Sequence, residues 1–421
     1  MRDCMLIEGR RIPLADLRRE AGAPDSPFVT ALLAEAPLDE GAAAHRDFLV
    51  EAGRFIADFL DPAPVITVHT SGSTGAPKPF AAEKARMRAS ARMTAAFLGL
   101  EPGGRNLLAM PLRFIAGRMV VVRSIECGLD LVAAPPKRNP FAGVTEPFAL
   151  AAVTPMQAVS ILDDPASAEV FLGCSNILIG GGAADEDLRA RLEAARGRVW
   201  ATYGMTETLS HVALRLLTGP DADPGFRALP GVELSLSEKG TLAIKAPAVA
   251  AGTLVTNDVV RFSSDGAFTV TGRLDNVINS GGIKVHPEVV EAKLKPLLPM
   301  PFAIAPRPDR LLGEEVVLVV EGTPDAAAAL DLMKLRAVLG RYECPKAVVA
   351  VPKLPLTATM KPDRPAIRAA AAAGLKVEAP RAQPEHAGRA APRPLPAELL
   401  HGPRVARPSP NEAALRAAVL S

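Results

Sequence analysis

Apolar runs alternate with helical patterns from about residue 65 to residue 200 of this chain. The stretches NLLAMP, LDLVAAP and NILI are short and mostly apolar, as strands are when both faces of a sheet are covered. Between such stretches, segments like EKARMRASARMTAAFLGL and GRMVVVRSIECG repeat apolar residues at helical spacing. The alternation predicts an α/β fold in which helices flank a mostly parallel sheet.

The pattern changes between residues 230 and 271. Two stretches there, GVELSLSEKGTLAIKAP and VVRFSSDGAFTVTG, alternate apolar with polar residues and turn at Lys239-Gly240 and Asp265-Gly266. Such alternation around a glycine turn is typical of antiparallel hairpins. We expect these hairpins to form a small β-barrel-like part of the larger domain.

The domain organisation follows from two further changes in composition. A new block of strands and helices begins near Asp275 and runs to about Leu375. This predicts a large amino-terminal domain over residues 1–274 and a smaller α+β carboxy-terminal domain over residues 275–375. Residues 376–421 are rich in proline, alanine and arginine with little apolar periodicity, which predicts a disordered tail.

Composition excludes several classes of partner. The 421 residues carry a formal net charge of +2 and are only 4% aromatic, which argues against nucleic acid. No apolar run approaches the roughly 18 residues of a membrane span, and the first residues do not resemble a signal peptide, so we expect a cytoplasmic protein. The four cysteines form no pair or metal-binding cluster, so any metal would arrive with a substrate.

A loop rich in glycine and hydroxyls, VHTSGSTGAPKPF, follows the strand predicted at residues 65–68. Glycine backbone and a lysine ammonium both favour an anion, which points to a nucleotide phosphate. The common P-loop pattern fails, because Pro77 precedes Lys78 and Pro79 follows it. Taken alone, the loop would also suit an ordinary surface turn.

Further stretches carry candidate chemistry, although each alone has an ordinary structural explanation. ILIGGGAADEDL places three glycines after a strand, where a flat ring could approach the backbone. ATYGMTET offers an aromatic ring, hydroxyls and a carboxylate. The remaining candidates come from VTNDVV, TGRLDNVINSGGIKVHPEVVE and KLPLTATMKPDR, and are Asp258, Arg273, Asp275, Gly281, Gly282, Lys284 and Lys361.

These motifs, in this order over about residues 65–365, resemble those of the AMP-forming acyl-CoA synthetases, within the adenylate-forming enzymes. The loop is similar to that family's [ST]-S-G-[ST]-T-G-x-P-K signature. Two segments, MPLRFIAGRMVVVRSIECG and NVINSGGIKVHPEVVEAKL, look most like short o-succinylbenzoate-CoA ligases of menaquinone biosynthesis. The resemblance implies ATP-dependent activation of a carboxylic acid as an acyl-adenylate, followed by transfer to coenzyme A.

The resemblance also implies a role for each motif. Lys361 would act between the acid and the α-phosphate, Thr206 would touch that phosphate, and Glu207 would bind Mg²⁺. Asp275 would be the hinge of a mobile carboxy-terminal domain, and Gly281 and Gly282 would meet coenzyme A. The implied ATP-binding residues are Thr70, Ser71, Gly72, Ser73, Thr74, Gly75, Lys78, Gly181, Gly182, Ala183, Tyr203, Gly204, Met205, Asp258 and Arg273.

The acid pocket is predicted from a charge argument. The aromatic carboxylate of o-succinylbenzoate would stay charged in the pocket and needs a cation. Arg118 and Arg123 both lie in the segment that resembles the family's pocket-side helix, and we rank Arg123 first. Phe114 and His211 are candidates to line the same pocket, with a buried structural histidine as the alternative for His211.

Some positions depart from the family pattern. Phe114 stands where many relatives carry histidine, Asn279 replaces a frequent lysine, and Met360 replaces a glycine before Lys361. Only about 65 residues precede the phosphate loop, so one wall of the pocket would be reduced or supplied by the second subunit of a homodimer. Two alternatives stay open, a ligase for another aryl or fatty acid and a regulatory protein that binds the nucleotide without catalysis.

Overall fold

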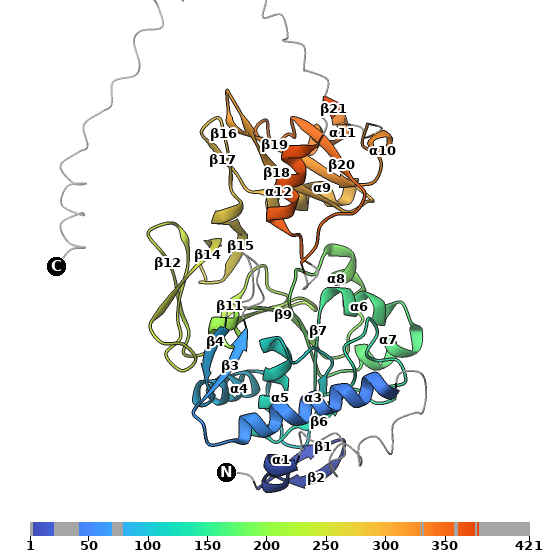
Figure 1. The fold of residues 1–421 in the computed structure, drawn as a ribbon, viewed down its shortest axis with the longest axis vertical. Helices are drawn as coiled ribbons and strands as arrows, with labels where there is room; N and C mark the ends of the chain where they lie inside the picture. Colours follow the sequence, from blue (N-terminus) through green and yellow to red (C-terminus); the bar gives the residue numbers. More distant parts are fainter. Residues whose placement is uncertain are drawn as a thin grey trace, which may run out of the picture. The chain divides into compact units, whose positions relative to one another are not determined.

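The structure is a computed structural model that describes residues 3–20, 42–69, 79–328, 330, 332–357, 361–374 and 377–378. The chain divides into two units, residues 1–379 and residues 380–421. The tail predicted to be disordered therefore lies almost wholly outside the described residues. Figure 1 shows the arrangement of the elements in the first unit.

A nine-stranded sheet is the centre of the amino-terminal part (Figure 1). Its middle strands, β1, β6, β5, β7, β8 and β9, pair in parallel, whereas β2, β10 and β11 pair antiparallel at the two edges. This confirms the prediction of a mostly parallel sheet. The strands are β1 Cys4–Ile7, β2 Arg10–Pro13, β5 Arg105–Leu108, β6 Asp130–Ala133, β7 Leu150–Val153, β8 Asn176–Ile179, β9 Arg198–Gly204, β10 His211–Leu216 and β11 Arg227–Ala228.

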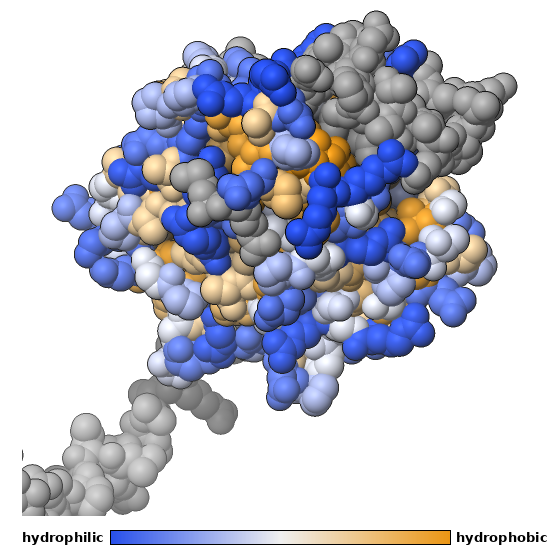
Figure 2. Space-filling model, turned by 90° about the horizontal axis from the view of Figure 1, so that it is seen from below, coloured by the Kyte–Doolittle hydropathy of each residue, from blue (hydrophilic) through white to orange (hydrophobic). Residues whose placement is uncertain are grey.

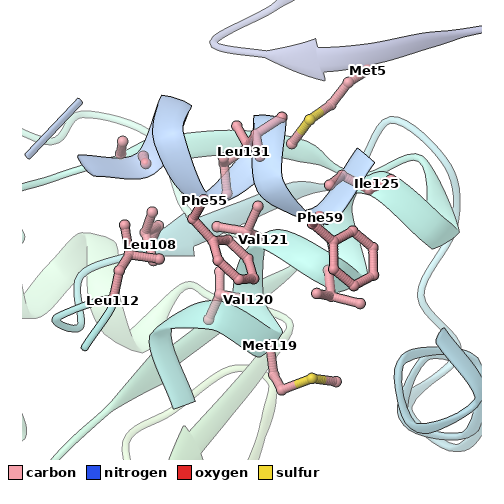
Figure 3. Packing of buried hydrophobic residues seen from close by; sticks show 14 of the residues in the cluster. Met5, Phe55, Phe59, Leu108, Leu112, Met119, Val120, Val121, Ile125 and Leu131 are labelled. Carbon is pink, nitrogen blue, oxygen red and sulfur yellow. The ribbon is translucent and has the colours of Figure 1, made fainter. Parts of the chain in front are cut away.

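Helices cover both faces of this sheet. Because neighbouring residues of a strand point to opposite faces, they pack against different helices. Leu108 packs with α3, α4 and α5, whereas Leu107 packs with α6, α7 and α8. Figure 3 shows the first cluster, in which Phe55 and Phe59 of α3 meet α5. The helices are α1 Leu14–Glu20, α3 Ala42–Leu60, α4 Lys84–Leu98, α5 Ile115–Cys127, α6 Pro155–Leu162, α7 Pro165–Leu172 and α8 Glu186–Leu192.

The phosphate loop joins two strands, not a strand and a helix as the sequence suggested. β3 (Val65–His69) pairs antiparallel with β4 (Pro79–Glu83), and α4 follows directly. The prediction missed β4 because PFAAE begins with a proline and contains two alanines and a glutamate, residue types that are depleted in strands. The consequence is that the two ends of the loop are held side by side.

Two more sheets follow along the chain. The predicted hairpins form a four-stranded antiparallel sheet in the order β12-β13-β14-β15, which is open in the described residues. The last sheet combines β16 to β21 with helices on its faces, as expected for an α+β unit. Their bounds are β12 Glu233–Leu236, β13 Thr241–Lys245, β14 Thr253–Phe262, β15 Phe268–Arg273, β16 Ile278–Ser280, β17 Ile283–Val285, β18 Phe302–Asp309, β19 Gly313–Glu321, β20 Ala347–Val351, β21 Val377–Glu378, α9 Pro287–Leu294, α10 Pro324–Ala328, α11 Leu332–Val338 and α12 Arg364–Ala373.

The boundary predicted at residue 275 falls in a short 3₁₀ helix, Leu274–Asn276, between β15 and β16. On the face drawn in Figure 2, hydrophilic side chains predominate and apolar ones gather in smaller areas. No helix within the described ranges is long and apolar enough to cross a bilayer.

Candidate active site

A cavity of about 1010 Å³ opens at the carboxyl ends of the parallel strands. The loops that follow β5, β7, β8 and β9 line it, together with the start of α5. Ligands of open α/β sheets bind at this end, where successive loops diverge. Lys295 and Lys361, from the carboxy-terminal part of the chain, also line the cavity.

Of the two residues that flank the predicted phosphate loop, His69 lines this cavity. The loop residues Thr70, Ser71, Gly72, Ser73, Thr74, Gly75 and Lys78 fall outside the described part of the chain. His69, directly before the loop, lines the cavity and pairs with Pro79, directly after it. The β3–β4 pairing therefore fixes both ends of the loop at this point.

The motifs after β8 and β9 do meet in the cavity. Gly181, Gly182 and Ala183 line one part of it, and Gly204, Met205 and Thr206 line another. Gly204 has a packing reason to be glycine, because a Cβ there would clash with the Ser210 carbonyl oxygen. The chain therefore folds back on itself between Gly204 and Ser210, which brings Ser210 and His211 to the same wall of the cavity as Gly204.

Asp258 is held by two donors from different strands. The Tyr203 hydroxyl donates a hydrogen bond of 2.5 Å to its Oδ2, and Arg273 Nη1 lies 3.2 Å from its Oδ1. Arg273 also makes a bidentate ion pair with Asp275, at 3.0 Å from both Nε and Nη2. Burial and the Asp258 carboxylate raise the pKa of Tyr203, so its hydroxyl stays a donor.

Lys361 lies close to this group. Desolvation lowers the pKa of its ammonium, with Asp258 opposing the shift and Arg273 adding to it. Backbone contacts set the position of the residue, because Thr357 N donates to Lys361 O at 2.8 Å and Leu356 forms a β-bridge with Pro362. Met360, the departure from the family pattern, falls outside the described residues.

Glu207 is the predicted magnesium ligand. It belongs to the 3₁₀ helix Thr206–Thr208, is half-buried, and makes no hydrogen bond or ion pair within the described ranges. No group of three or more metal-binding side chains forms among those residues either. One free carboxylate fits Mg²⁺, which is usually held by one or two carboxylates, water and the phosphates of a nucleotide.

Arg123 lines the cavity and is 3% exposed. Its Nη2 donates to Ser210 Oγ at 2.5 Å, whereas its Nε is buried without a partner. Burial lowers the pKa of this arginine to about 10, with only a small opposing effect from Cys127. A buried guanidinium at a cavity wall with a free donor is a site for an anion.

His211 and Phe114 also line the cavity, but Arg118 does not. Arg118 donates to the carbonyl oxygens of Leu112 and Thr67, both at 2.6 Å, so its donors are taken by backbone. His211 is fully buried, and burial together with Arg123 holds its pKa well below 6.5. It is therefore neutral near pH 7.

Gly281 and Gly282 form the turn between β16 and β17, with φ of 61° and 82°. A two-residue hairpin turn in this left-handed region favours glycine whatever the function. Neither glycine lines the cavity, nor does Lys284, two residues further along the chain. A role with coenzyme A stays a prediction.

Ser210, which lines the cavity, and Thr94, which is buried behind it, were not predicted from the sequence. Ser210 contacts both Arg123 and His211, and Thr94 Oγ1 lies 3.1 Å from His211 Nε2. Thr94 could have been noticed, since it is a polar residue at the same helical spacing as the buried Met87, Ala91 and Leu98. Nothing in the sequence connects it to residue 211.

Comparisons with known proteins bear on this arrangement. The AMP-binding enzyme family matches residues 6–257, more than half of the chain. The chain belongs to the AMP-binding enzyme family. It is 32% identical over 342 residues to a probable 2-succinylbenzoate–CoA ligase of Mycobacterium tuberculosis, covering 74% of this chain and 86% of that relative.

Two solved structures extend the comparison. The AMP-forming acyl-CoA synthetase/AMP-acid ligase II-like protein of Dyadobacter fermentans is 34% identical, with a TM-score of 0.52, covering 80% of this chain and 96% of that one. The o-succinylbenzoate coenzyme A synthetase of Bacillus subtilis, solved with ATP and magnesium ion, is 17% identical with a TM-score of 0.62, covering 86% and 96%. The second similarity shows the shared adenylate-forming fold.

Proposed function

We propose that this AMP-binding enzyme is an ATP-dependent ligase that joins 2-succinylbenzoate to coenzyme A through an acyl-adenylate, as a step in menaquinone biosynthesis. The observation that carries the proposal is the cavity itself. It brings Lys361, next to Asp258, and the buried Arg123 to the walls of one space. One cation suits the reacting centre, and the other suits a second carboxylate.

The first half-reaction joins two anions. A carboxylate oxygen of the acid attacks the α-phosphorus of ATP, a new P–O bond forms, and the bond to pyrophosphate breaks. Repulsion between the anions is the main obstacle, so positioned cations and donors stabilise the transition state. Lys361 would supply the cation between the two reactants, and Thr206 would donate to the α-phosphate. Glu207 would hold Mg²⁺, which neutralises phosphate charge when bound.

Nucleotide recognition would fall to the residues around Asp258. Its carboxylate, already fixed by Tyr203 and Arg273, retains lone pairs that can accept both ribose hydroxyls. Gly181, Gly182 and Ala183 leave backbone uncovered for the flat adenine. The phosphate loop from Thr70 to Lys78 would take the β- and γ-phosphates.

The second half-reaction needs a thiol to reach the acyl-adenylate. The sulfur of coenzyme A attacks the acyl carbon, and AMP leaves. A cavity that excludes water from the mixed anhydride must therefore reopen, and a swing of residues 275–375 about Asp275 would withdraw Lys361 and present Gly281 and Gly282. A homodimer completing the acid pocket also remains part of the proposal.

A thioester assay over a panel of acids tests this function. We expect ATP- and coenzyme A-dependent product from 2-succinylbenzoate, with little from benzoate or palmitate. Product from another acid alone would overturn the assignment of substrate. ATP binding without acid-dependent pyrophosphate exchange would instead identify a nucleotide-binding protein.

A further inference from the structure

A chain of hydrogen bonds connects Arg123 to the interior of the protein. Arg123 Nη2 lies 2.5 Å from Ser210 Oγ, which lies 3.3 Å from His211 Nδ1. On its other side, His211 Nε2 lies 3.1 Å from Thr94 Oγ1, and that hydroxyl lies 3.1 Å from the Ser90 carbonyl oxygen. Three segments far apart in sequence, α4, α5 and the start of β10, thus meet at one charged side chain.

The direction of each hydrogen bond follows from the two ends of the chain. Arg123 can only donate, and the Ser90 carbonyl can only accept. Since Thr94 donates its single hydroxyl hydrogen to Ser90, His211 Nε2 must carry the proton that Thr94 accepts. His211 Nδ1 is then an acceptor, and it takes the hydrogen of Ser210, whose oxygen accepts from Arg123. Every member has one orientation.

The orientation depends on a neutral His211. A protonated ring would turn an N–H toward Ser210, whose hydrogen would then have to point at the donor Arg123. It would also place a second buried cation next to the first. Burial and Arg123 both lower the pKa of His211, so the chain keeps a single positive charge, on Arg123.

The backbone before Ser210 is fixed in an uncommon conformation. Leu209, directly before it, has φ of 63°, one of two non-glycine residues with positive φ in the described part of the chain. Such a conformation costs free energy and persists where the surroundings determine it. Leu209 also lines the cavity, and it turns the chain so that Ser210 meets Arg123.

We propose that Ser210, His211 and Thr94 are positioning residues that hold the Arg123 guanidinium toward the cavity, where it selects acids with a second carboxylate. This inference rests on the proposed function. Ser210 takes one donor of Arg123, and Nη1, which makes no hydrogen bond to the described residues and is not sealed in the interior as Nε is, stays free for the carboxylate that is not activated. The chain acts through Arg123 and does not touch the reacting atoms.

The test compares two acids that differ in one group. 2-Succinylbenzoate carries the aromatic carboxylate, and its analogue 4-oxo-4-phenylbutanoate lacks that carboxylate. We expect Ser210→Ala and His211→Leu to raise KM for 2-succinylbenzoate about tenfold, the size of a charge-assisted hydrogen bond, with kcat nearly unchanged. For the analogue, kcat/KM should change by less than about twofold in the same variants.

Two further variants separate positioning from simple packing. His211→Asn offers Ser210 an amide oxygen in place of Nδ1, so it should recover part of the preference that His211→Leu loses. Thr94→Val should reduce the preference for 2-succinylbenzoate over 4-oxo-4-phenylbutanoate, whereas Ser90→Ala should not. Ser90 is the matched control, because its buried hydroxyl lies one turn away on the same helix and has no partner.

Each outcome decides the inference. Equal losses for both acids in Ser210→Ala, or the same loss of preference in Ser90→Ala, would overturn it and leave the proposed function standing. If the wild type rejects 2-succinylbenzoate, the proposed substrate fails and the comparison moves to the dicarboxylic acid that the panel identifies. A wild type that prefers no dicarboxylic acid over its monocarboxylic analogue overturns the inference as well.

Discussion

The Tyr203 hydroxyl donates a hydrogen bond of 2.5 Å to Asp258 Oδ2 and fixes the carboxylate proposed to bind the ribose. Tyr203→Phe keeps the ring, which packs edge-on against Phe268, and removes only the donor. We expect KM for ATP to rise about three- to tenfold with kcat little changed, as the loss of one hydrogen bond predicts. Tyr342→Phe is the matched control, because Tyr342 is the other tyrosine and is exposed. Unchanged KM for ATP in Tyr203→Phe would refute this use of Asp258.

Lys361 supplies the second prediction. Lys361→Ala should slow adenylation about 10²- to 10³-fold, because a positioned cation is worth roughly 3 to 4 kcal/mol in such a transition state. ATP should still bind, since Asp258 and the phosphate loop are intact. Acid-dependent pyrophosphate exchange measures the first effect and calorimetry the second. Lys293→Ala, which breaks an exposed ion pair with Glu343, should leave exchange unchanged. Exchange within a few-fold of wild type in Lys361→Ala would remove Lys361 from the mechanism.

The relation between Asp258 and Arg273 shows how far sequence could lead. The turn at Asp265-Gly266 predicts that β14 pairs with β15, and Phe262 does pair with Phe268. Counting back at constant register would put Asp258 opposite Gly272, with Arg273 on the other face. A bulge between Val259 and Val260 shifts the register by one residue and sets Asp258 opposite Arg273. The hairpin was predictable, but the ion pair depends on that irregularity.

The acid pocket shows a second limit of prediction. Arg118 and Arg123 lie five positions apart on α5, so they face different directions, and periodicity alone could not decide which one enters the cavity. The choice is made by Ser210, by the Thr67 carbonyl and by the Leu112 carbonyl, and of these only Leu112 is near in sequence. Continuous apolar runs in the sequence predict the parallel sheet, whereas contacts between distant segments produce no periodic pattern in the sequence.

The hinge predicted at Asp275 can be tested separately from its ion pair. Asp275→Ala removes the contact with Arg273 but leaves the backbone free, whereas Asp275→Pro also restricts φ. If residues 275–375 swing between half-reactions, Asp275→Pro should slow thioester formation at least about tenfold more than pyrophosphate exchange. Asp275→Ala should affect both half-reactions alike. Equal loss of both in Asp275→Pro would argue against a hinge at this residue.

His211 predicts a pH dependence of stability. Its native pKa lies well below the value of 6.5 for the unfolded chain, so below pH 6.5 the unfolded state binds a proton that the native state does not. The free energy of unfolding therefore falls as pH drops, by at most about 1.4 kcal/mol per pH unit from this residue. Urea unfolding should show that the free energy of unfolding falls less between pH 7.5 and pH 5.5 in His211→Asn than in the wild type. The difference isolates His211, since other histidines are common to both proteins. Parallel losses would mean that His211 is not buried neutral.

Arg123 predicts an opposition between stability and function. Its guanidinium is buried with no carboxylate partner, so Arg123→Met should stabilise the protein, by on the order of 1 kcal/mol, while abolishing the preference for a dicarboxylic acid. Arg307 is the matched control, because it is also buried but pairs with Glu315 at 2.7 Å. Arg307→Met should destabilise by about 3 to 5 kcal/mol, since it leaves a buried carboxylate unpaired. Thermal unfolding measures both. Destabilisation by Arg123→Met as large as that by Arg307→Met would mean that Arg123 serves the fold and not an anion in the cavity.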